Sequence, residues 1–185
     1  MSEELTYKIC VVGPEKSGKS CLINRIALNV FKEQPTNEPL VKRVIRVAGN
    51  LICLDLYECI NVKEKERTKY YQGVDCILFI VSMEDIGSLC LIPSLVDEAE
   101  KMGSIPSSSI LVATKSDGSV EIEESEIYKM AQNLQLKCLL VSSRTGYGVD
   151  NLLFEIQNDI FSIMEKNALK HSHDKSSKKL VCFCY

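Results

Sequence analysis

A short segment near the N-terminus has the residue types and the spacing to hold phosphate groups. Residues 13–20 read Gly-Pro-Glu-Lys-Ser-Gly-Lys-Ser and fit the pattern G-x-x-x-x-G-K-[ST], between an apolar run and a helical one. In such a loop the backbone N–H groups turn inward and, together with the N-terminus of the helix, bind an anion. We expect Lys19 to reach the β- and γ-phosphates of a nucleotide and Ser20 to offer its hydroxyl oxygen to Mg²⁺. The other expected nucleotide contacts in this segment are Gly13, Glu15, Lys16, Ser17, Gly18 and Cys21.

Two later segments concern the base of the nucleotide. An apolar run ends in Thr114-Lys115-Ser116-Asp117, which resembles the guanine-specificity motif [NT]-K-x-D of the Ras superfamily of small GTPases. The resemblance implies that the Asp117 carboxylate accepts hydrogen bonds from guanine N1–H and the exocyclic amine, while the Lys115 stem covers one face of the base. Adenine lacks this pair of donors, so the carboxylate would be left unpaired and ATP would be rejected. Ser142-Ser143-Arg144, after a further apolar run, resembles the S-A-K loop of the family, whose backbone N–H contacts the guanine oxygen.

The order and spacing of these motifs resemble those of a small GTPase over residues 7–166. Residues 70–75, Tyr-Tyr-Gln-Gly-Val-Asp, are similar to the Y-Y-x-G-[AV] segment of Rab proteins, so we expect a divergent, Rab-like branch. The resemblance implies a P-loop GTPase fold, an α/β fold with a six-stranded, mostly parallel sheet, one antiparallel edge strand and helices on both faces. It also implies GTP or GDP and Mg²⁺ as cofactors.

The two segments that sense the γ-phosphate in this family depart from its pattern. By resemblance, Thr36 in the first switch would bind Mg²⁺ and read the γ-phosphate, and Phe31 would pack edge-on against the guanine. The second switch should read D-x-x-G followed by Gln. We interpret Asp55 as the Asp of that motif, which would hold Mg²⁺ through a water molecule. Glu58 then replaces the Gly, and Cys59 replaces the Gln.

These departures predict a protein that binds nucleotide but hydrolyses GTP slowly. A carboxylate at Glu58 would repel the γ-phosphate, and a thiol at Cys59 lacks the paired donor and acceptor with which an amide orients the attacking water. Two functions stay open. One is a nucleotide-dependent switch that recruits effector and regulatory proteins through residues 32–47 and 56–75. The other is a pseudo-GTPase module that holds GTP constitutively as a structural ligand. A nucleoside or nucleotide kinase is disfavoured by the T-K-x-D motif and by the lack of a lid-like Arg-rich segment.

Alternating apolar and helical runs would position these residues. Short strand-like runs and longer helix-like runs follow one another, which favours a sheet covered on both faces. The predicted strands cover residues 7–12, 41–47, 51–56, 75–81, 110–114 and 137–141. The predicted helices cover residues 19–29, 86–102, 123–134 and 149–166, with a weak one over 62–72.

Composition and charge limit the class of protein. The chain has 185 residues, 45% hydrophobic and 25% charged, which suits one folded domain with a short appendage. We expect a monomeric GTPase domain over residues 1–166 and a flexible tail over residues 167–185. The formal net charge of −3 does not suggest a nucleic-acid-binding protein, and no apolar run has the length that a bilayer span needs. The nine cysteines have no Cys-x-x-Cys spacing and suit reduced thiols in the cytosol.

The end of the tail carries candidate lipidation sites. Cys182 lies at the position that C-a-a-X prenylation requires, although Cys184 and Tyr185 are poor residues for the last positions. The pair Cys182 and Cys184 also resembles the twin-cysteine ends of Rab proteins, and the lysines before it would attract anionic lipid. We therefore expect attachment to the cytosolic face of a membrane through this tail.

Overall fold

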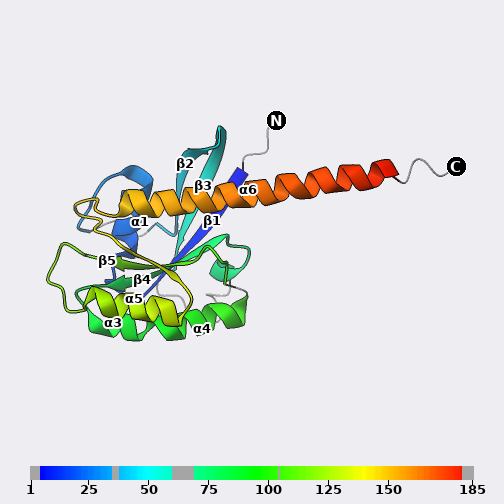
Figure 1. Ribbon diagram of the computed structural model, residues 1–185. Coiled ribbons are helices and arrows are strands. Elements are labelled where there is room, and N and C mark those ends of the chain that lie inside the picture. Colours follow the sequence, from blue (N-terminus) through cyan, green and yellow to red (C-terminus); the bar gives the residue numbers. More distant parts are fainter. Residues whose placement is uncertain (1–4, 35–37, 60–68, 104, 181–185) are drawn as a thin grey trace.

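A six-stranded sheet forms the centre of the computed structural model, which describes residues 5–34, 38–59, 69–103 and 105–180, with side chains as far as residue 167 (Figure 1). The strands are β1 (Leu5–Val12), β2 (Leu40–Val47), β3 (Asn50–Glu58), β4 (Cys76–Ser82), β5 (Ile110–Thr114) and β6 (Lys137–Leu140). The described helices are α1 (Lys19–Leu28), α3 (Ile86–Cys90), α4 (Ile92–Met102), α5 (Glu124–Asn133) and α6 (Val149–Leu180).

Parallel pairing runs through most of the sheet, whose strand order is β2-β3-β1-β4-β5-β6. β1 pairs in parallel with β3 and β4, and β5 pairs in parallel with β4 and β6. Only the edge strand β2 runs antiparallel, as a hairpin with β3. The structure therefore confirms the expected fold, a mostly parallel sheet with one antiparallel edge strand and helices on both faces.

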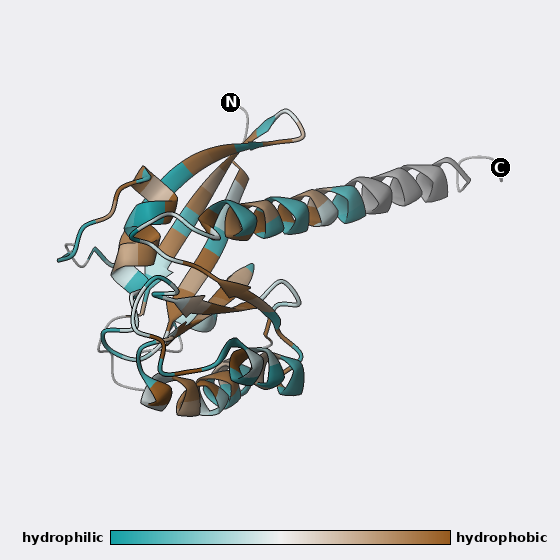
Figure 2. Ribbon diagram, turned by 60° about the vertical axis from the view of Figure 1, so that its left-hand side comes forward, coloured by the Kyte–Doolittle hydropathy of each residue, from teal (hydrophilic) through white to brown (hydrophobic). Residues whose placement is uncertain are grey.

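Alternation along the central strands sends side chains into two separate cores. On β1, Ile9 and Val11 pack with residues of α1 and α6, whereas Cys10 and Val12 pack with residues of α3, α4 and α5. Every residue of β4 is buried between the same two layers, which explains why its sequence is apolar almost throughout instead of alternating. Figures 1 and 2 show the two helical layers, with the hydrophobic strands between them.

The carboxyl ends of the parallel strands meet at one edge of the sheet. The loop over residues 13–18 follows β1, the segment 115–117 follows β5, and the segment 141–146 follows β6. In open α/β sheets, ligands bind outside this edge. The fold therefore brings the three motifs of the sequence to the place where such a sheet binds a ligand.

The helix predicted over residues 86–102 is divided into two. α3 ends at Cys90 and α4 begins at Ile92, with Leu91 between them. Pro93 lies in the first turn of α4. In a continuous helix its ring would clash with the carbonyl group of Leu89, and it has no N–H to donate to that group. The chain avoids the clash by starting a new helix, whose first turn accepts a proline.

The last helix extends beyond the predicted end at residue 166. α6 continues to Leu180 and projects past the sheet (Figure 1). The apolar spacing is lost after residue 166, and this loss predicted the end of the helix there. Residues 167–180 contain neither Gly nor Pro, so no residue of that stretch breaks the helix.

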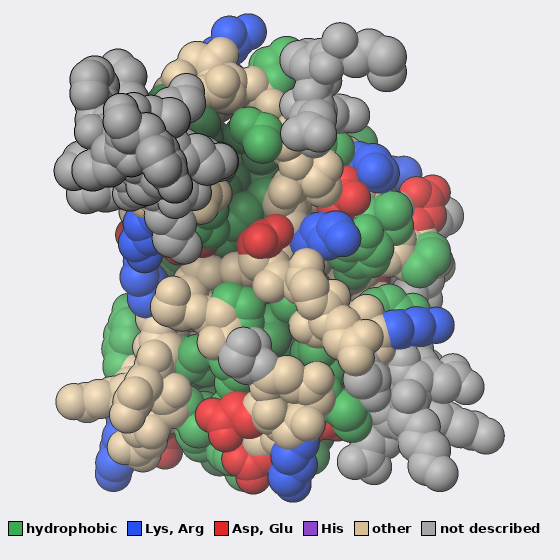
Figure 3. Space-filling model, turned by 90° about the vertical axis from the view of Figure 1, so that its right-hand side faces the viewer, with side chains coloured by type: hydrophobic (Ala, Val, Ile, Leu, Met, Phe, Trp, Pro, Cys, Tyr) green, Lys and Arg blue, Asp and Glu red, His purple; other side chains and the backbone are tan. Residues whose placement is uncertain are grey.

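Further observations concern the cysteines, membrane-spanning helices, surface charge and the weak helix predicted over residues 62–72. None of the seven cysteines that the structure describes forms a disulfide bond. Within the described ranges, no helix is both long and apolar enough to cross a bilayer. On the face shown in Figure 3, acidic and basic side chains of the described residues are interspersed and do not gather by sign. Of the weak helix predicted over residues 62–72, residues 69–71 are helical, and residues 62–68 lie outside the described part of the chain.

Gly148 offers a test of how closely the loop before α6 packs against β6. Its φ is +71°, and a Cβ placed there would lie 2.1 Å from the carbonyl oxygen of Leu140. Gly146 has a similar φ of +88°, but a Cβ there would meet nothing within 4 Å. Either alanine substitution strains the backbone by about 1–2 kcal/mol. Only Gly148→Ala adds a backbone clash, so we expect it to lower the free energy of unfolding by about 3 kcal/mol or more.

Chemical denaturation of the two variants measures this difference. Gly146→Ala is the matched control, because it shares the loop and the left-handed backbone. Equal losses of stability in the two variants would contradict the close packing of Gly148 against Leu140.

Candidate nucleotide-binding site

The segment after β1 forms a tight loop that leads into α1. Lys16 and Gly18 have positive φ values of 60° and 93°, which turn the chain back on itself before the helix begins. The Ser17 hydroxyl donates to the carbonyl group of Pro14 at 2.8 Å and closes the turn. The loop therefore has the curled backbone of an anion-binding nest at the N-terminus of a helix.

The ammonium group of Lys19 is held against this loop. Its Nζ donates to the carbonyl groups of Gly13 at 3.1 Å and Pro14 at 2.7 Å, and the residue is 8% exposed. Burial lowers the pKa of Lys19, while Glu58, Cys59 and Glu15 raise it in part. A cation that has lost much of its hydration is stabilised by an anion nearby, so this lysine suits a phosphate.

Ser20, in the first turn of α1, faces Glu58. Its Oγ donates to Oε1 of Glu58 at 2.7 Å. Glu58 is the last residue of β3 and is 4% exposed. Burial raises the pKa of its carboxyl group, while the Ser20 hydrogen bond and the charge of Lys19 lower it in part. The hydroxyl and carboxylate oxygens form a pair of hard ligands of the kind that Mg²⁺ prefers.

Asp55, the expected carboxylate beside the metal, lies elsewhere. Its Oδ1 is 3.2 Å from Nζ of Lys42 on β2, and it accepts a hydrogen bond from the Tyr57 hydroxyl at 3.4 Å. The structure therefore does not bring Asp55 to Ser20, and the expected neighbour of the Ser20 hydroxyl is corrected to Glu58. Thr36, the other expected metal ligand, lies outside the described residues.

Alternation along β3 explains the correction. Ile52, Leu54 and Leu56 belong to the core that includes α1, and successive side chains of a strand point to opposite faces. Glu58 shares the face of these even-numbered residues, whereas Asp55 lies on the other. The spacing of the apolar residues indicates which face of β3 each residue takes, but a comparison with the D-x-x-G motif does not consider that spacing.

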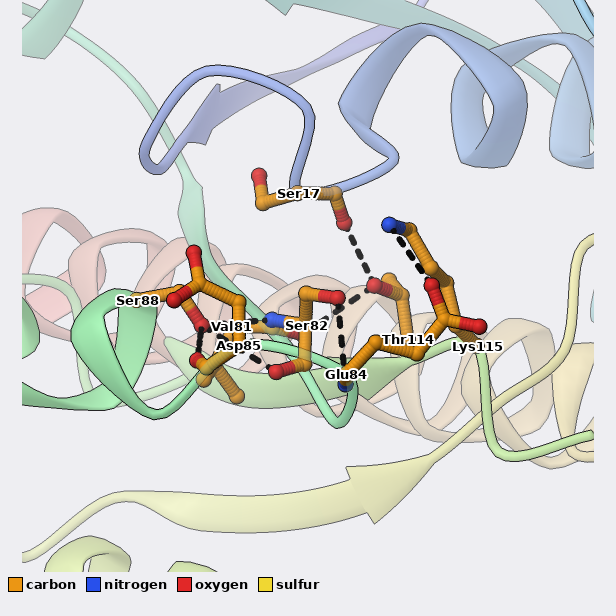
Figure 4. A network of polar contacts seen from close by, with 8 residues as sticks. All are labelled: Ser17, Val81, Ser82, Glu84, Asp85, Ser88, Thr114 and Lys115. Atoms are coloured by element: carbon orange, nitrogen blue, oxygen red, sulfur yellow. Dashed lines mark hydrogen bonds and ion pairs between the residues drawn. The ribbon is translucent and has the colours of Figure 1, made fainter. Parts of the chain in front are cut away.

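Thr114 connects the phosphate loop to the end of β5. Its buried hydroxyl lies within hydrogen-bonding distance of the carbonyl groups of Ser17 and of Val81, the latter at 3.0 Å. Figure 4 shows these contacts next to the ion pair between Lys115 and Glu84, whose charged atoms are 3.1 Å apart. The Thr114 side chain and the Ser17 backbone thus join the segments that are expected to bind the base and the phosphates.

The third segment is attached to the same end of the sheet. The Ser116 N–H donates to the carbonyl group of Val141 at 3.3 Å. Ser142 and Ser143 are buried, and the Ser142 hydroxyl accepts from the Thr145 N–H at 3.0 Å. Asp117 and Arg144 are exposed at this edge.

The expected contacts beyond the loops lie around α1. Cys21 is half-buried, and its thiol donates to the carbonyl group of Lys32 at 3.5 Å, which brings the stretch containing Phe31 against the start of α1. Burial raises the pKa of the Cys21 thiol. Glu15 and Lys16 are exposed on the phosphate loop, and Phe31 is 36% exposed.

The sheet order, the curled loop after β1 and the T-K-x-D segment after β5 together define a P-loop GTPase fold. The sequence model of the Ras family matches residues 8–162 of the chain. The chain belongs to the Ras family, as a divergent, Rab-like member.

Named relatives show how divergent it is. The chain is 26% identical to Ras-related protein RabH of Dictyostelium discoideum, with 97% of each chain covered. It is 27% identical to Ras-related protein Rab-34 of Mus musculus, over 90% of this chain and 70% of the relative. It is 24% identical to GTP-binding protein ypt1 of Schizosaccharomyces pombe, over 94% of this chain and 89% of the relative.

Replacing the Thr114 hydroxyl should measure the connection between the segments. In Thr114→Val the shape is kept, but the one hydroxyl hydrogen that can bond to the buried carbonyl group of Ser17 or of Val81 is lost. We expect the free energy of unfolding to fall by about 1–3 kcal/mol, the cost of unsatisfied buried polar groups. The exposed strand residue Thr6 provides the control, since Thr6→Val should stay within about 0.5 kcal/mol of the wild type. Thermal and chemical denaturation report both values, and a neutral Thr114→Val would contradict the connection.

Proposed function

We propose that the protein binds GTP and GDP with Mg²⁺ and acts as a membrane-attached regulatory switch whose own hydrolysis of GTP is slow. One observation carries the proposal: residues 13–20, 114–117 and 142–144 lie at one edge of the sheet, joined by the Thr114–Ser17 and Ser116–Val141 hydrogen bonds. Membership of the Ras family and similarity to Rab-named proteins support it.

The roles of the residues follow from their places. The curled loop and Lys19 would hold the phosphates, and the Lys19 ammonium group, already close to two loop carbonyls, would shift only a short way to reach them. Asp117 would accept from the N1–H and amine of guanine, and the loop of Ser142, Ser143 and Arg144 would direct backbone N–H groups at its oxygen. The Lys115 stem, with its charge paired to Glu84, would cover the base.

The residues fit a Mg²⁺ ion next to the phosphates. Ser20 and Glu58 supply two oxygen ligands or ligand partners 2.7 Å apart. Because the described residues contain no group of three or more His, Cys, Asp or Glu side chains that could hold a metal, the other ligands would be phosphate oxygens and water. When bound, the ion neutralises phosphate charge. Glu58 and Ser20 would hold it in place.

Slow hydrolysis is proposed from the sequence of the second switch. With Glu58 as the acid of the D-x-x-G pattern, the Gly and Gln positions fall on Asn61 and Val62, which lie outside the described residues. In this alignment Val62, and not Cys59, stands where the family has Gln. A valine has no polar group with which to orient the attacking water.

Membrane attachment rests on the tail. Cys182 and Cys184 are the candidate lipidation sites and lie outside the described residues. α6 leads away from the sheet toward them (Figure 1). Effector and regulatory proteins would bind the switch segments. A second candidate, a pseudo-GTPase module that holds GTP constitutively, is favoured by Val62, and unequal partner affinities for the GTP-loaded and GDP-loaded forms would exclude it.

Guanine selectivity is the first test. Full-length protein is loaded with fluorescent GTP, GDP or ATP, and the dissociation constants are compared. We expect guanine nucleotides to bind at least about 10⁴-fold more tightly than ATP, as a site built to accept two donors rejects a base without them. Single-turnover hydrolysis of bound GTP should proceed at or below roughly 10⁻⁴ s⁻¹, the scale of unassisted small GTPases. Equal binding of ATP, or no binding of any nucleotide, would overturn the proposal.

The choice of Glu58 over Asp55 has its own test in the Mg²⁺ dependence of nucleotide release. In Glu58→Gln the charge beside Ser20 is lost, so release of fluorescent GDP in Mg²⁺ should speed up about tenfold and approach the rate in EDTA. Asp55→Asn is the matched control, and it should leave the effect of Mg²⁺ unchanged because Asp55 lies on the other face of β3. The reverse pattern would restore Asp55 as the residue beside the metal.

A further inference from the structure

One arginine of α1 holds the third segment of the site. The Nε of Arg25 donates to the carbonyl group of Ser143 at 2.6 Å, and its Nη2 donates to the carbonyl group of Arg144 at 2.8 Å. Its Nη1 donates to the carbonyl group of Asn29, the C-cap of α1, at 3.1 Å. A single half-buried guanidinium group therefore holds three backbone carbonyl groups, two of them in the loop that resembles the S-A-K motif.

The planar fork of arginine is what makes this geometry possible. The N–H donors of the guanidinium group lie in one plane, and the group stays protonated. Hydrogen bonds from a charged donor are also stronger than those between neutral groups. The hydrogen bond to Asn29 also orients the Arg25 side chain within its own helix. The side chain therefore loses less conformational freedom when it binds the loop. A lysine has one ammonium group and could not hold all three carbonyl groups in these directions.

Holding a carbonyl group also fixes the direction of the next N–H. The peptide unit is planar and trans, so the Arg144 N–H points opposite to the Ser143 carbonyl group. The Ser142 carbonyl group is held in turn by the Gly146 N–H at 2.8 Å, which fixes the Ser143 N–H in the same way. The Arg144 carbonyl group points at Arg25, while the Thr145 N–H bonds to the Ser142 hydroxyl. The directions of successive peptide units in this loop are thus set one by one.

We propose that Arg25 is a positioning residue for guanine recognition: it holds the carbonyl groups of Ser143 and Arg144 so that the loop keeps the shape in which the Arg144 N–H faces the 6-oxygen of the base. The inference rests on the proposed function, since it presumes that a guanine nucleotide occupies the site. It adds a residue on α1, the helix that starts at the phosphate loop, to those that read the base. Phosphate binding and base reading then depend on the same helix.

The test compares bases that have or lack the 6-oxygen. Full-length wild type and Arg25→Met are titrated with GDP, with IDP, which keeps the 6-oxygen but lacks the 2-amino group, and with the diphosphate of 2-aminopurine riboside, which lacks the 6-oxygen. We expect GDP and IDP each to bind about tenfold more weakly to Arg25→Met, which corresponds to the loss of roughly one hydrogen bond between neutral groups. The 2-aminopurine nucleotide should change by less than about twofold, because it makes no bond that Arg25 orients.

Two further variants keep the test decisive. Arg25→Lys keeps the charge without the planar fork, and it should show the same selective loss to a smaller degree even if Arg25→Met folds poorly. Arg46→Met is the control, because Arg46 is exposed on β2 and reaches only the Gly49 carbonyl group at 3.4 Å. An equal loss for all three nucleotides, or no loss at all, would overturn the role of Arg25. Failure of the wild type to bind any of them would instead overturn the proposed function.

Discussion

The alternation of side chains along β3 decides which acid meets the first turn of α1. The sheet is covered on both faces at its centre, so the register of each strand is fixed by where its apolar residues must lie. On β3, Leu54 and Leu56 belong to the core under α1, and Glu58 follows them on that face. A shift of one residue would bring Tyr57 to Ser20 and turn both leucines outward. The packing of a few aliphatic side chains thus determines the chemistry of the candidate metal site.

Much of the fold could be predicted because its signals are local or periodic. The predicted ends of the strands lie within two residues of the observed ends, since buried runs such as residues 110–114 are apolar from end to end. The meeting of the three nucleotide motifs followed from parallel strands whose carboxyl ends share an edge. These parts of the structure depend on composition and order, both of which a single sequence displays.

Other parts could not be predicted in the same way, for different physical reasons. The break before Pro93 was visible in the sequence, but it was outweighed by the apolar spacing on both sides of it. Residues 167–180 of α6 lack the apolar spacing that predicts a buried helix, and they also lack the Gly and Pro residues that would break one. Glu58 was misassigned because a motif compares residue types, whereas the structure selects by face. Arg25 gave no signal at all, since the loop carbonyl groups that it binds lie more than a hundred positions away in the sequence.

The hydrogen bonds that connect the loops of the site share one feature, a backbone acceptor, which suits a chain of diverged sequence. Thr114, Ser116 and Arg25 each donate to a backbone carbonyl group of a neighbouring loop. A backbone acceptor is present whatever residue occupies the position, so only the donor has to be kept. Identities of 24–27% to the three relatives named above are compatible with the same arrangement of loops on this basis.

The length of α6 bears on how the proposed membrane attachment would position the GTPase domain. The helix has 32 residues, which at about 1.5 Å per residue makes a rod of roughly 48 Å. The helix packs on the domain as far as Met164, so a chain anchored beyond Leu180 would carry its GTPase domain on the remaining length of about 24 Å. A stiff spacer of this kind would limit the angles and heights that the switch segments could reach above the bilayer, and it would favour partners that present their binding surface within that range.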